Sequence, residues 1–255
     1  MPYTSITRMI NKLLASLGFK LIKTSQQANP FPDFEDSFSE ILKACKPFTM
    51  TSEERLYSLY KAAEYVSKSN IPGDIVECGV WRGGSTMCAL LSLTKQNDLT
   101  RKVFLYDTYE GMSEPTEKDA DHSGKNAQQL LNQSEKTTED IMWCYAPIDD
   151  VKKNISSTQY PIEKVVFVKG KVEETIPQTV PDKIAILRLD TDWYESTYHE
   201  LTHLYPKLVS GGVLIIDDYG HWKGAREAVD QYFKENNIEM LLNRIDYTGR
   251  IGIKK

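Results

Sequence analysis

The fold of this chain is decided by Asp-Ile-Val-Glu-Cys-Gly-Val-Trp-Arg-Gly-Gly-Ser-Thr, residues 74–86. The first six residues, 74–79, have the apolar centre of a buried strand. A glycine-containing turn follows, and a helix is predicted to begin near Ser85. Strand, tight turn and helix in this order indicate the first unit of an α/β fold.

Four further apolar runs follow, and helical stretches separate most of them. Their continuous apolar cores are typical of parallel strands that are covered on both faces. The predicted strands are 74–79, 102–107, 164–169, 184–190 and 212–217. This alternation predicts a doubly wound α/β fold with a mostly parallel sheet. Residues 238–243 and 250–254 flank a turn and predict an antiparallel hairpin at the C-terminal end.

The chain is expected to divide near residue 36. Residues 1–36 combine an amphipathic helix with a polar linker that contains two prolines, and residues 37–255 form the main domain. The helix is expected to pack on the enzyme or on a second copy in a homo-oligomer, and the alternative is an interfacial membrane helix. Thr51 and Glu54 form a possible capping box for a helix through Ser67.

Residues 111–150 interrupt the alternation with a long polar stretch. The insertion follows the second predicted strand, and the carboxyl ends of strands are where α/β sheets bind ligands. It is therefore interpreted as a lid over the active site, with a helix around 125–133. The alternative is a surface excursion without a role.

The composition narrows the function. The 255 residues carry a formal net charge of −5, which does not suit a dedicated nucleic-acid binder. Four cysteines without a C-x-x-C pair argue for a reducing compartment, so a cytoplasmic location is expected. No apolar run approaches the roughly 20 residues that span a bilayer, so stable membrane insertion is not expected.

The glycine turn is a candidate cofactor site. Gly79 and the pair 83–84 let the backbone approach a ligand, and the following helix offers free N–H groups. Trp81 replaces the second glycine of the dinucleotide motif, so a pyrophosphate fits less well than the amino-acid end of a cofactor. Glu77 could bind an ammonium group there. The alternative is a purely structural turn.

Asp107 ends the second predicted strand. An acidic residue at this place can accept hydrogen bonds from both ribose hydroxyls. It therefore indicates a nucleoside cofactor without separating NAD from S-adenosylmethionine (SAM), and a strand-ending cap is the alternative.

Acidic residues end two further strands. Asp190 ends one, and Asp217 and Asp218 end the other. If these strands are neighbours, the three carboxylates converge and need a cation, and hard oxygen ligands select Mg²⁺, Ca²⁺ or Mn²⁺. Such an ion would lower the pKa of an acceptor hydroxyl, and Asp192 is the candidate base. The alternative for 217–218 is helix capping.

Two of the four histidines have a candidate role. His122 lies in the predicted lid and His221 closely follows the second acidic pair, so either could contact the acceptor or act as a second base. His199 and His203 are four residues apart on a predicted helix but lack an H-E-x-x-H context, which favours packed or solvated side chains.

Several blocks of this sequence resemble the macrocin O-methyltransferase family, which includes mycinamicin and novobiocin sugar methyltransferases. They are Val-Glu-Cys-Gly-Val-Trp-Arg-Gly-Gly-Ser, Tyr-Asp-Thr-Tyr-Glu-Gly-Met, Leu-Arg-Leu-Asp-Thr-Asp-Trp-Tyr-Glu-Ser-Thr, Leu-Tyr-Pro-Lys-Leu and Gly-Gly-Val-Leu-Ile-Ile-Asp-Asp-Tyr-Gly, in order over roughly residues 48–233.

The resemblance implies a class I SAM-dependent methyltransferase fold with a seven-stranded sheet. It implies SAM as methyl donor, Mg²⁺ dependence and a sugar hydroxyl on a glycosylated natural product as acceptor. It maps the metal ligands to Asp190, Asp217 and Asp218, and the catalytic base to Asp192 beside Asp190. The implied SAM contacts are Thr51, Glu77, Gly79, Ser85, Asp107, Gly111 and Glu173. Glu173, which would reach the adenine, stands where the family leads us to expect Asp.

Three alternatives to this function stay open at the level of sequence. The first is a methyltransferase for a catechol-type acceptor, which also chelates through adjacent oxygens. The second is a nucleotide-dependent oxidoreductase on a related sheet. The third is a SAM-binding or scaffold protein without catalysis, in which the aspartates are structural.

Overall fold

The computed structural model describes residues 30–138 and 140–255, together with 10, 12, 14, 15, 17 and 18. It divides into two compact units, Met1–Glu35 and Asp36–Lys255. The N-terminal helix and linker predicted over 1–36 lie largely outside the described residues. Among the described residues, no helix is long and apolar enough to cross a membrane.

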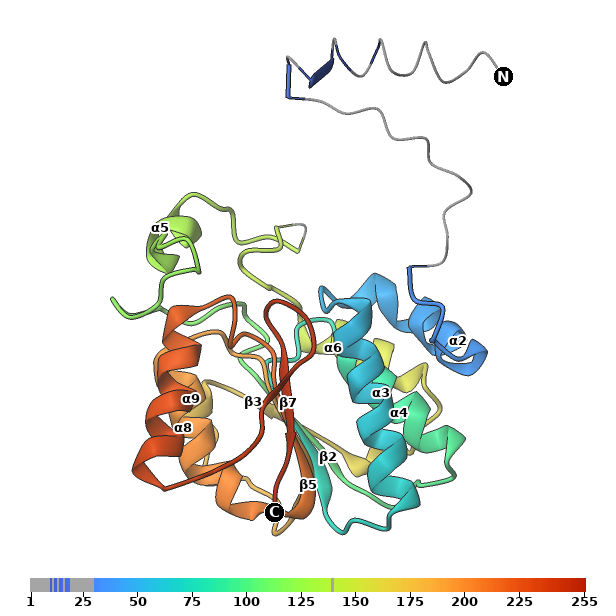
Figure 1. The fold of residues 1–255 in the computed structure, drawn as a ribbon. Helices are drawn as coiled ribbons and strands as arrows, with labels where there is room; N and C mark the ends of the chain where they lie inside the picture. Colours follow the sequence, from blue (N-terminus) through green and yellow to red (C-terminus); the bar gives the residue numbers. More distant parts are fainter. Residues whose placement is uncertain (1–9, 11, 13, 16, 19–29, 139) are drawn as a thin grey trace. The chain divides into compact units, whose positions relative to one another are not determined.

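The larger unit is built on one seven-stranded sheet with the strand order β3-β2-β1-β4-β5-β7-β6 (Figure 1). All pairings are parallel except those of β7 with β5 and β6. The strands are β1 Asp74–Cys78, β2 Val103–Asp107, β3 Val165–Lys169, β4 Ile184–Leu189, β5 Leu208–Ile216, β6 Asn243–Arg244 and β7 Arg250–Ile253. The doubly wound parallel sheet with an antiparallel C-terminal hairpin is confirmed.

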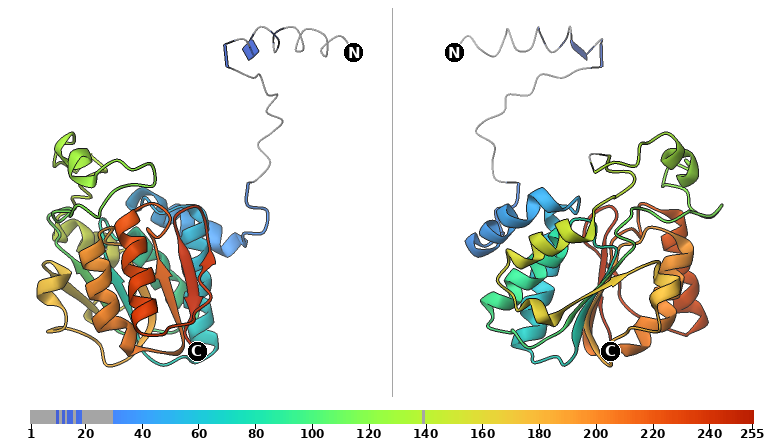
Figure 2. Two further views of the ribbon diagram at one scale, coloured as in Figure 1. Left: turned by 60° about the vertical axis from the view of Figure 1, so that its left-hand side comes forward. Right: turned by 180° about the vertical axis from the view of Figure 1, so that it is seen from behind.

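Helices cover both faces of the sheet. α8 and α9 lie against one face, and α3, α4 and α6 lie against the other (Figures 1 and 2). The helices of this unit are α2 Asp36–Cys45, α3 Glu53–Lys68, α4 Gly84–Lys95, α5 Ala127–Asn132, α6 Ile148–Ser156, α7 Val172–Thr175, α8 Tyr194–Leu204 and α9 Lys223–Glu235. Burial on both faces explains the continuous apolar strands, and every residue of β4 is buried.

Some predicted boundaries are wrong. Ser52 caps α3, because its hydroxyl accepts a hydrogen bond from the Arg55 backbone N–H. Thr51 is buried and is not the N-cap residue, so the predicted capping box of Thr51 and Glu54 is not formed. β5 begins at Leu208, before the predicted residue 212. The hairpin strand predicted over 238–243 is reduced to β6 at 243–244, because only these residues pair with β7.

The polar insertion stands at the carboxyl edge of the sheet, with α5 as its helix (Figure 1). Several contacts attach it to the body, and two of them involve residues that follow β4. The buried Asp119 carboxylate accepts a hydrogen bond from the backbone N–H of Tyr194, 2.8 Å away, at the start of α8. The Trp193 indole donates to the Ser113 carbonyl at 3.0 Å. Both contacts fix the insertion directly beside the residues that follow β4.

Gly79 sets how closely the ends of β1 and β4 approach. Its φ of +82° lies in the left-handed region, and a Cβ there would stand 1.9 Å from the Asp190 carbonyl oxygen. Any side chain would therefore push the turn after β1 away from Asp190.

We expect Gly79→Ala to lower the free energy of unfolding by several kcal/mol, because strain and a backbone clash add together. Gly124→Ala is the matched control: its φ of +93° is also left-handed, but the nearest atom to a Cβ is the flexible end of Lys223 at 3.5 Å. The control should cost about 1–2 kcal/mol. Urea unfolding measures both, and equal losses would contradict the proposed close approach.

Candidate active site

A cavity of about 420 Å³ opens at the carboxyl edge of the sheet. Residues after β1, β2, β4 and β5 line it together with the two ends of the insertion, and segments 48–51, 170–173 and 247–248 also contribute. β1 and β4 are neighbours in the sheet although they are distant in sequence, so the strand order reverses between them. Doubly wound sheets bind ligands at such a switch point.

Asp107 organises the turn after β1. Its Oδ2 accepts hydrogen bonds from the backbone N–H groups of Val80 at 2.7 Å and Trp81 at 2.9 Å, and its Oδ1 accepts from Tyr109 at 2.6 Å. Trp81 is held at φ +46°, which a bulky residue rarely adopts. The carboxylate thus fixes the glycine turn from the neighbouring strand.

Most of the sequence-predicted cofactor residues share this cavity. Its lining includes Thr51, Gly79, Ser85, Asp107, Gly111 and Glu173. They come from four separate segments of the chain, and only the tertiary fold brings these segments together.

Glu77 is the exception, because it does not belong to the cavity lining. It is buried beneath the turn, where its carboxylate accepts hydrogen bonds from Ser85, Thr86 and Arg188. Burial raises the pKa of Glu77, and the Arg188 charge acts in the opposite direction. Arg188 therefore occupies the place that the sequence analysis gave to a cofactor ammonium group.

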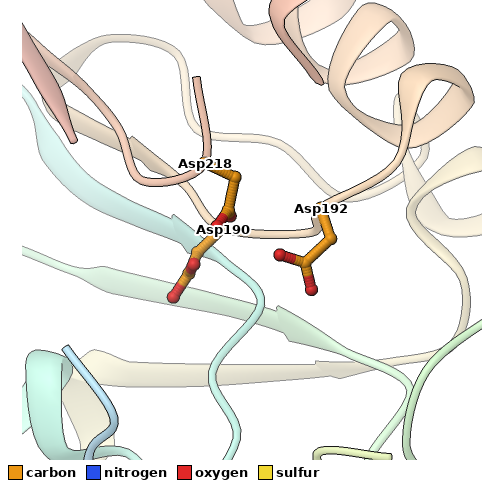
Figure 3. A group of neighbouring side chains, drawn as sticks. All are labelled: Asp190, Asp192 and Asp218. Atoms are coloured by element: carbon orange, nitrogen blue, oxygen red, sulfur yellow. The ribbon is translucent and has the colours of Figure 1, made fainter. Parts of the chain in front are cut away.

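Three carboxylates converge where β4 and β5 end (Figure 3). One oxygen from each of Asp190, Asp192 and Asp218 lies within 4.8 Å of the others. The Oδ2 atom of Asp218 is buried without a hydrogen-bond partner among the described residues. The pKa of Asp192 is raised to about 7, mainly by burial and next by the charge of Asp190. The pKa of Asp218 is also raised, mainly by burial and next by the charge of Asp192. A cation would relieve this repulsion.

Asp217 lines the same cavity but does not belong to that group of three. Its Oδ1 accepts a hydrogen bond from Arg188 at 2.6 Å, and its Oδ2 forms an ion pair with Arg55. Arg55 also donates to Asp246 in the turn between β6 and β7, at 3.0 Å. The structure thus places Asp192 in the acidic cluster and holds Asp217 between two arginines.

Arg188 is the residue that sequence reasoning missed. Its guanidinium is 2% exposed and lies 2.6 Å from Glu77 and 2.7 Å from Asp190. The same group reaches Asp217 at 2.6 Å and the Thr51 hydroxyl at 3.1 Å. The sequence does contain an indication of its importance, because Arg188 is the one charged residue in the apolar strand β4. A charge buried in such a strand needs partners of opposite charge.

The histidines separate into two groups. His221 lines the cavity, and His122 lies 5.4 Å from it between ring centroids. His199 and His203 lie on α8 and do not belong to the lining, and the His199 ring bonds the Ile176 carbonyl at 2.9 Å.

Comparison with known proteins identifies the family of this chain. Residues 43–252 match the family model described as macrocin O-methyltransferase (TylF). The chain belongs to the macrocin O-methyltransferase family. It is 33% identical over 201 residues to demethyldecarbamoylnovobiocin O-methyltransferase of Streptomyces niveus, covering 79% of this chain and 73% of that one. Identity to mycinamicin III 3''-O-methyltransferase of Micromonospora griseorubida is also 33%, covering 79% and 76%.

The structure of the O-methyltransferase NovP superposes with a TM-score of 0.70 at 30% identity, covering 82% of each chain. This macrocin-family chain is therefore a SAM-dependent O-methyltransferase with the class I fold. The named relatives are all methyltransferases, which favours methyl transfer over the oxidoreductase alternative.

We predict that Arg188→Lys folds but binds S-adenosylhomocysteine about tenfold more weakly, because an ammonium cannot reproduce the fork between Glu77, Asp190 and Asp217. Calorimetry measures the affinity. Arg101→Lys is the control, since Arg101 pairs with Asp98 and bonds Ile71 and Gly73 carbonyls outside this cavity. If both variants lose only stability, the role of Arg188 is purely structural.

Proposed function

We propose that this enzyme methylates a hydroxyl of a sugar on a glycosylated natural product, with SAM as methyl donor and Mg²⁺ or another hard divalent cation bound. The observation that carries this proposal is the single cavity that joins the predicted cofactor residues to the acidic cluster. An O-methyltransferase needs a sulfonium donor and an activated hydroxyl in one enclosed space.

The cofactor is proposed to lie over the turn after β1. Asp107 remains at the cavity wall and keeps lone pairs for ribose hydroxyls, since each carboxylate oxygen can accept more than one hydrogen bond. Ser85 in the first turn of α4 and the backbone of Gly79 suit the amino-acid end. Glu173 would face the adenine. Glu77 supports the turn from below instead of binding the cofactor.

The acidic cluster fits a hard cation. Its donors are carboxylate oxygens, and the unpartnered Asp218 oxygen has the unsatisfied charge that a cation would balance. Asp190 and Asp218 are the proposed ligands. Asp217 is the third proposed ligand, and it would have to bind the cation with oxygens that also pair with Arg188 and Arg55. A bound divalent cation would lower the pKa of the acceptor hydroxyl.

Asp192 is the proposed base. It adjoins the two proposed ligands and lines the cavity, and its raised pKa suits a group that exchanges a proton near neutral pH. Its backbone φ of +68° is unusual for a non-glycine residue and holds the carboxylate at the edge of the cluster. Asp192 would take the proton of the acceptor hydroxyl, and the oxygen would attack the methyl group of SAM, so that the sulfur–methyl bond breaks and S-adenosylhomocysteine leaves.

The sugar acceptor is inferred from the relatives. The names of the two relatives given above contain demethyldecarbamoylnovobiocin and mycinamicin III. A third relative, from Streptomyces olivaceus and 34% identical over 201 residues, is named for a rhamnosyl tetracenomycin. An antibiotic or similar secondary metabolite is therefore proposed, and a catechol is the alternative acceptor. The cytoplasmic location and the homo-oligomer stay predictions from sequence.

Methyl transfer from labelled SAM to a panel of glycosides and catechols, with and without EDTA, tests the proposal. We expect methylated glycosides and a loss of activity on chelation, restored by Mg²⁺. Activity that survives complete chelation would remove the metal from the proposal, and methylation of catechols alone would change the acceptor class.

Asparagine substitutions separate the proposed roles. Asp218→Asn should weaken Mn²⁺ binding, measured by electron paramagnetic resonance, by about tenfold or more, because a ligand charge is lost. Asp192→Asn should keep most Mn²⁺ affinity and lose about 10²–10⁴-fold in kcat. Asp230→Asn on α9 is the control. Equal loss of Mn²⁺ binding in the first two variants would make Asp192 a ligand.

A further inference from the structure

Three side chains from distant segments meet beside the acidic cluster. His122 comes from the insertion, His221 follows β5 and Tyr247 lies in the turn between β6 and β7. The ring centroids of His122 and His221 are 5.4 Å apart, and that of Tyr247 lies 6.1 Å and 6.0 Å from theirs. We call these three residues the ring wall.

The ring wall is attached to the proposed reaction centre. The backbone N–H of His221 donates to the Asp218 carbonyl at 3.0 Å. His221 and Tyr247 line the same cavity as Asp192 and Asp218. Trp222, next to His221, lines this cavity as well. A molecule that presents a hydroxyl to Asp192 would therefore share its cavity with His221 and Tyr247.

One hydrogen bond fixes the orientation of the ring wall. The Tyr247 hydroxyl bonds Nδ1 of His221 at 3.0 Å. Among the described residues this is the one side-chain hydrogen bond of His221, so its Nε2 is left for a partner in the cavity.

We propose that the ring wall binds the hydroxyl-bearing ring of the acceptor, with His221 Nε2 hydrogen-bonded to a hydroxyl next to the one that is methylated. This inference rests on the proposed function. Flat rings suit the C–H face of a sugar, and a fixed imidazole nitrogen supplies the directional contact. Because Met112 and Ser113 of the insertion also line this cavity, bound acceptor would touch the insertion and the body together.

The four histidines allow a direct test by NMR. Ring signals of ¹³C-histidine-labelled protein are followed with S-adenosylhomocysteine and Mg²⁺ present, while methyl α-L-rhamnopyranoside is titrated and catechol is titrated separately. We expect His122 and His221 to shift with the rhamnoside. His199 and His203 on α8 are internal controls that should not move.

Tyr247→Phe removes only the hydroxyl that orients His221. It should weaken rhamnoside binding about tenfold and leave the affinity for S-adenosylhomocysteine unchanged. Tyr198→Phe is the control, because that hydroxyl bonds Glu235 at the exposed surface of α8 and α9.

The outcomes separate this inference from the proposed function. Unmoved His122 and His221 signals with both ligands would overturn the ring wall, as would a Tyr247→Phe variant that binds the rhamnoside normally. Shifts with catechol alone would support the ring wall and contradict the sugar acceptor. Methylation of glycosides in the enzyme assay without any histidine shift would keep the proposed function and overturn the ring wall.

Discussion

The active-site end of this fold depends on one buried guanidinium. Arg188 lies in the centre of the sheet, and its two terminal nitrogens hold Glu77 on β1, Asp190 after β4 and Asp217 after β5. Glu77 and Asp217 are buried and Asp190 is partly buried, and carboxylates this close together repel one another unless a positive charge lies between them. The arginine therefore lets three neighbouring strands end in acidic residues.

That arrangement links the two halves of the proposed site. Through Glu77 the network reaches Ser85 under the cofactor turn, and through Asp217 it reaches Arg55 and the C-terminal hairpin. Gly79 allows the turn after β1 to lie directly against the Asp190 backbone. The proposed cofactor turn and the acidic cluster are therefore neighbours. Proximity of this kind is what methyl transfer requires, since donor and acceptor must be aligned.

Sequence reasoning identified the fold reliably where patterns are local. The five apolar strands, the glycine turn and the strand-ending aspartates follow from periodicity and residue type. It misplaced the cap of α3, because Ser52 and Thr51 are equally good candidates until burial separates them. It also did not reveal that Glu77 pairs with Arg188, because that partner is a strand residue distant along the chain.

The sequence by itself determined the α/β alternation, the family and the set of acidic residues available for chemistry. Only the tertiary structure decided which carboxylates meet: Asp192 joins Asp190 and Asp218, whereas Asp217 turns to two arginines. Likewise, only the fold brings His122, His221 and Tyr247 together. The physical reason is that side-chain direction at a strand end is set by packing and charge pairing across neighbouring strands, which linear spacing does not encode.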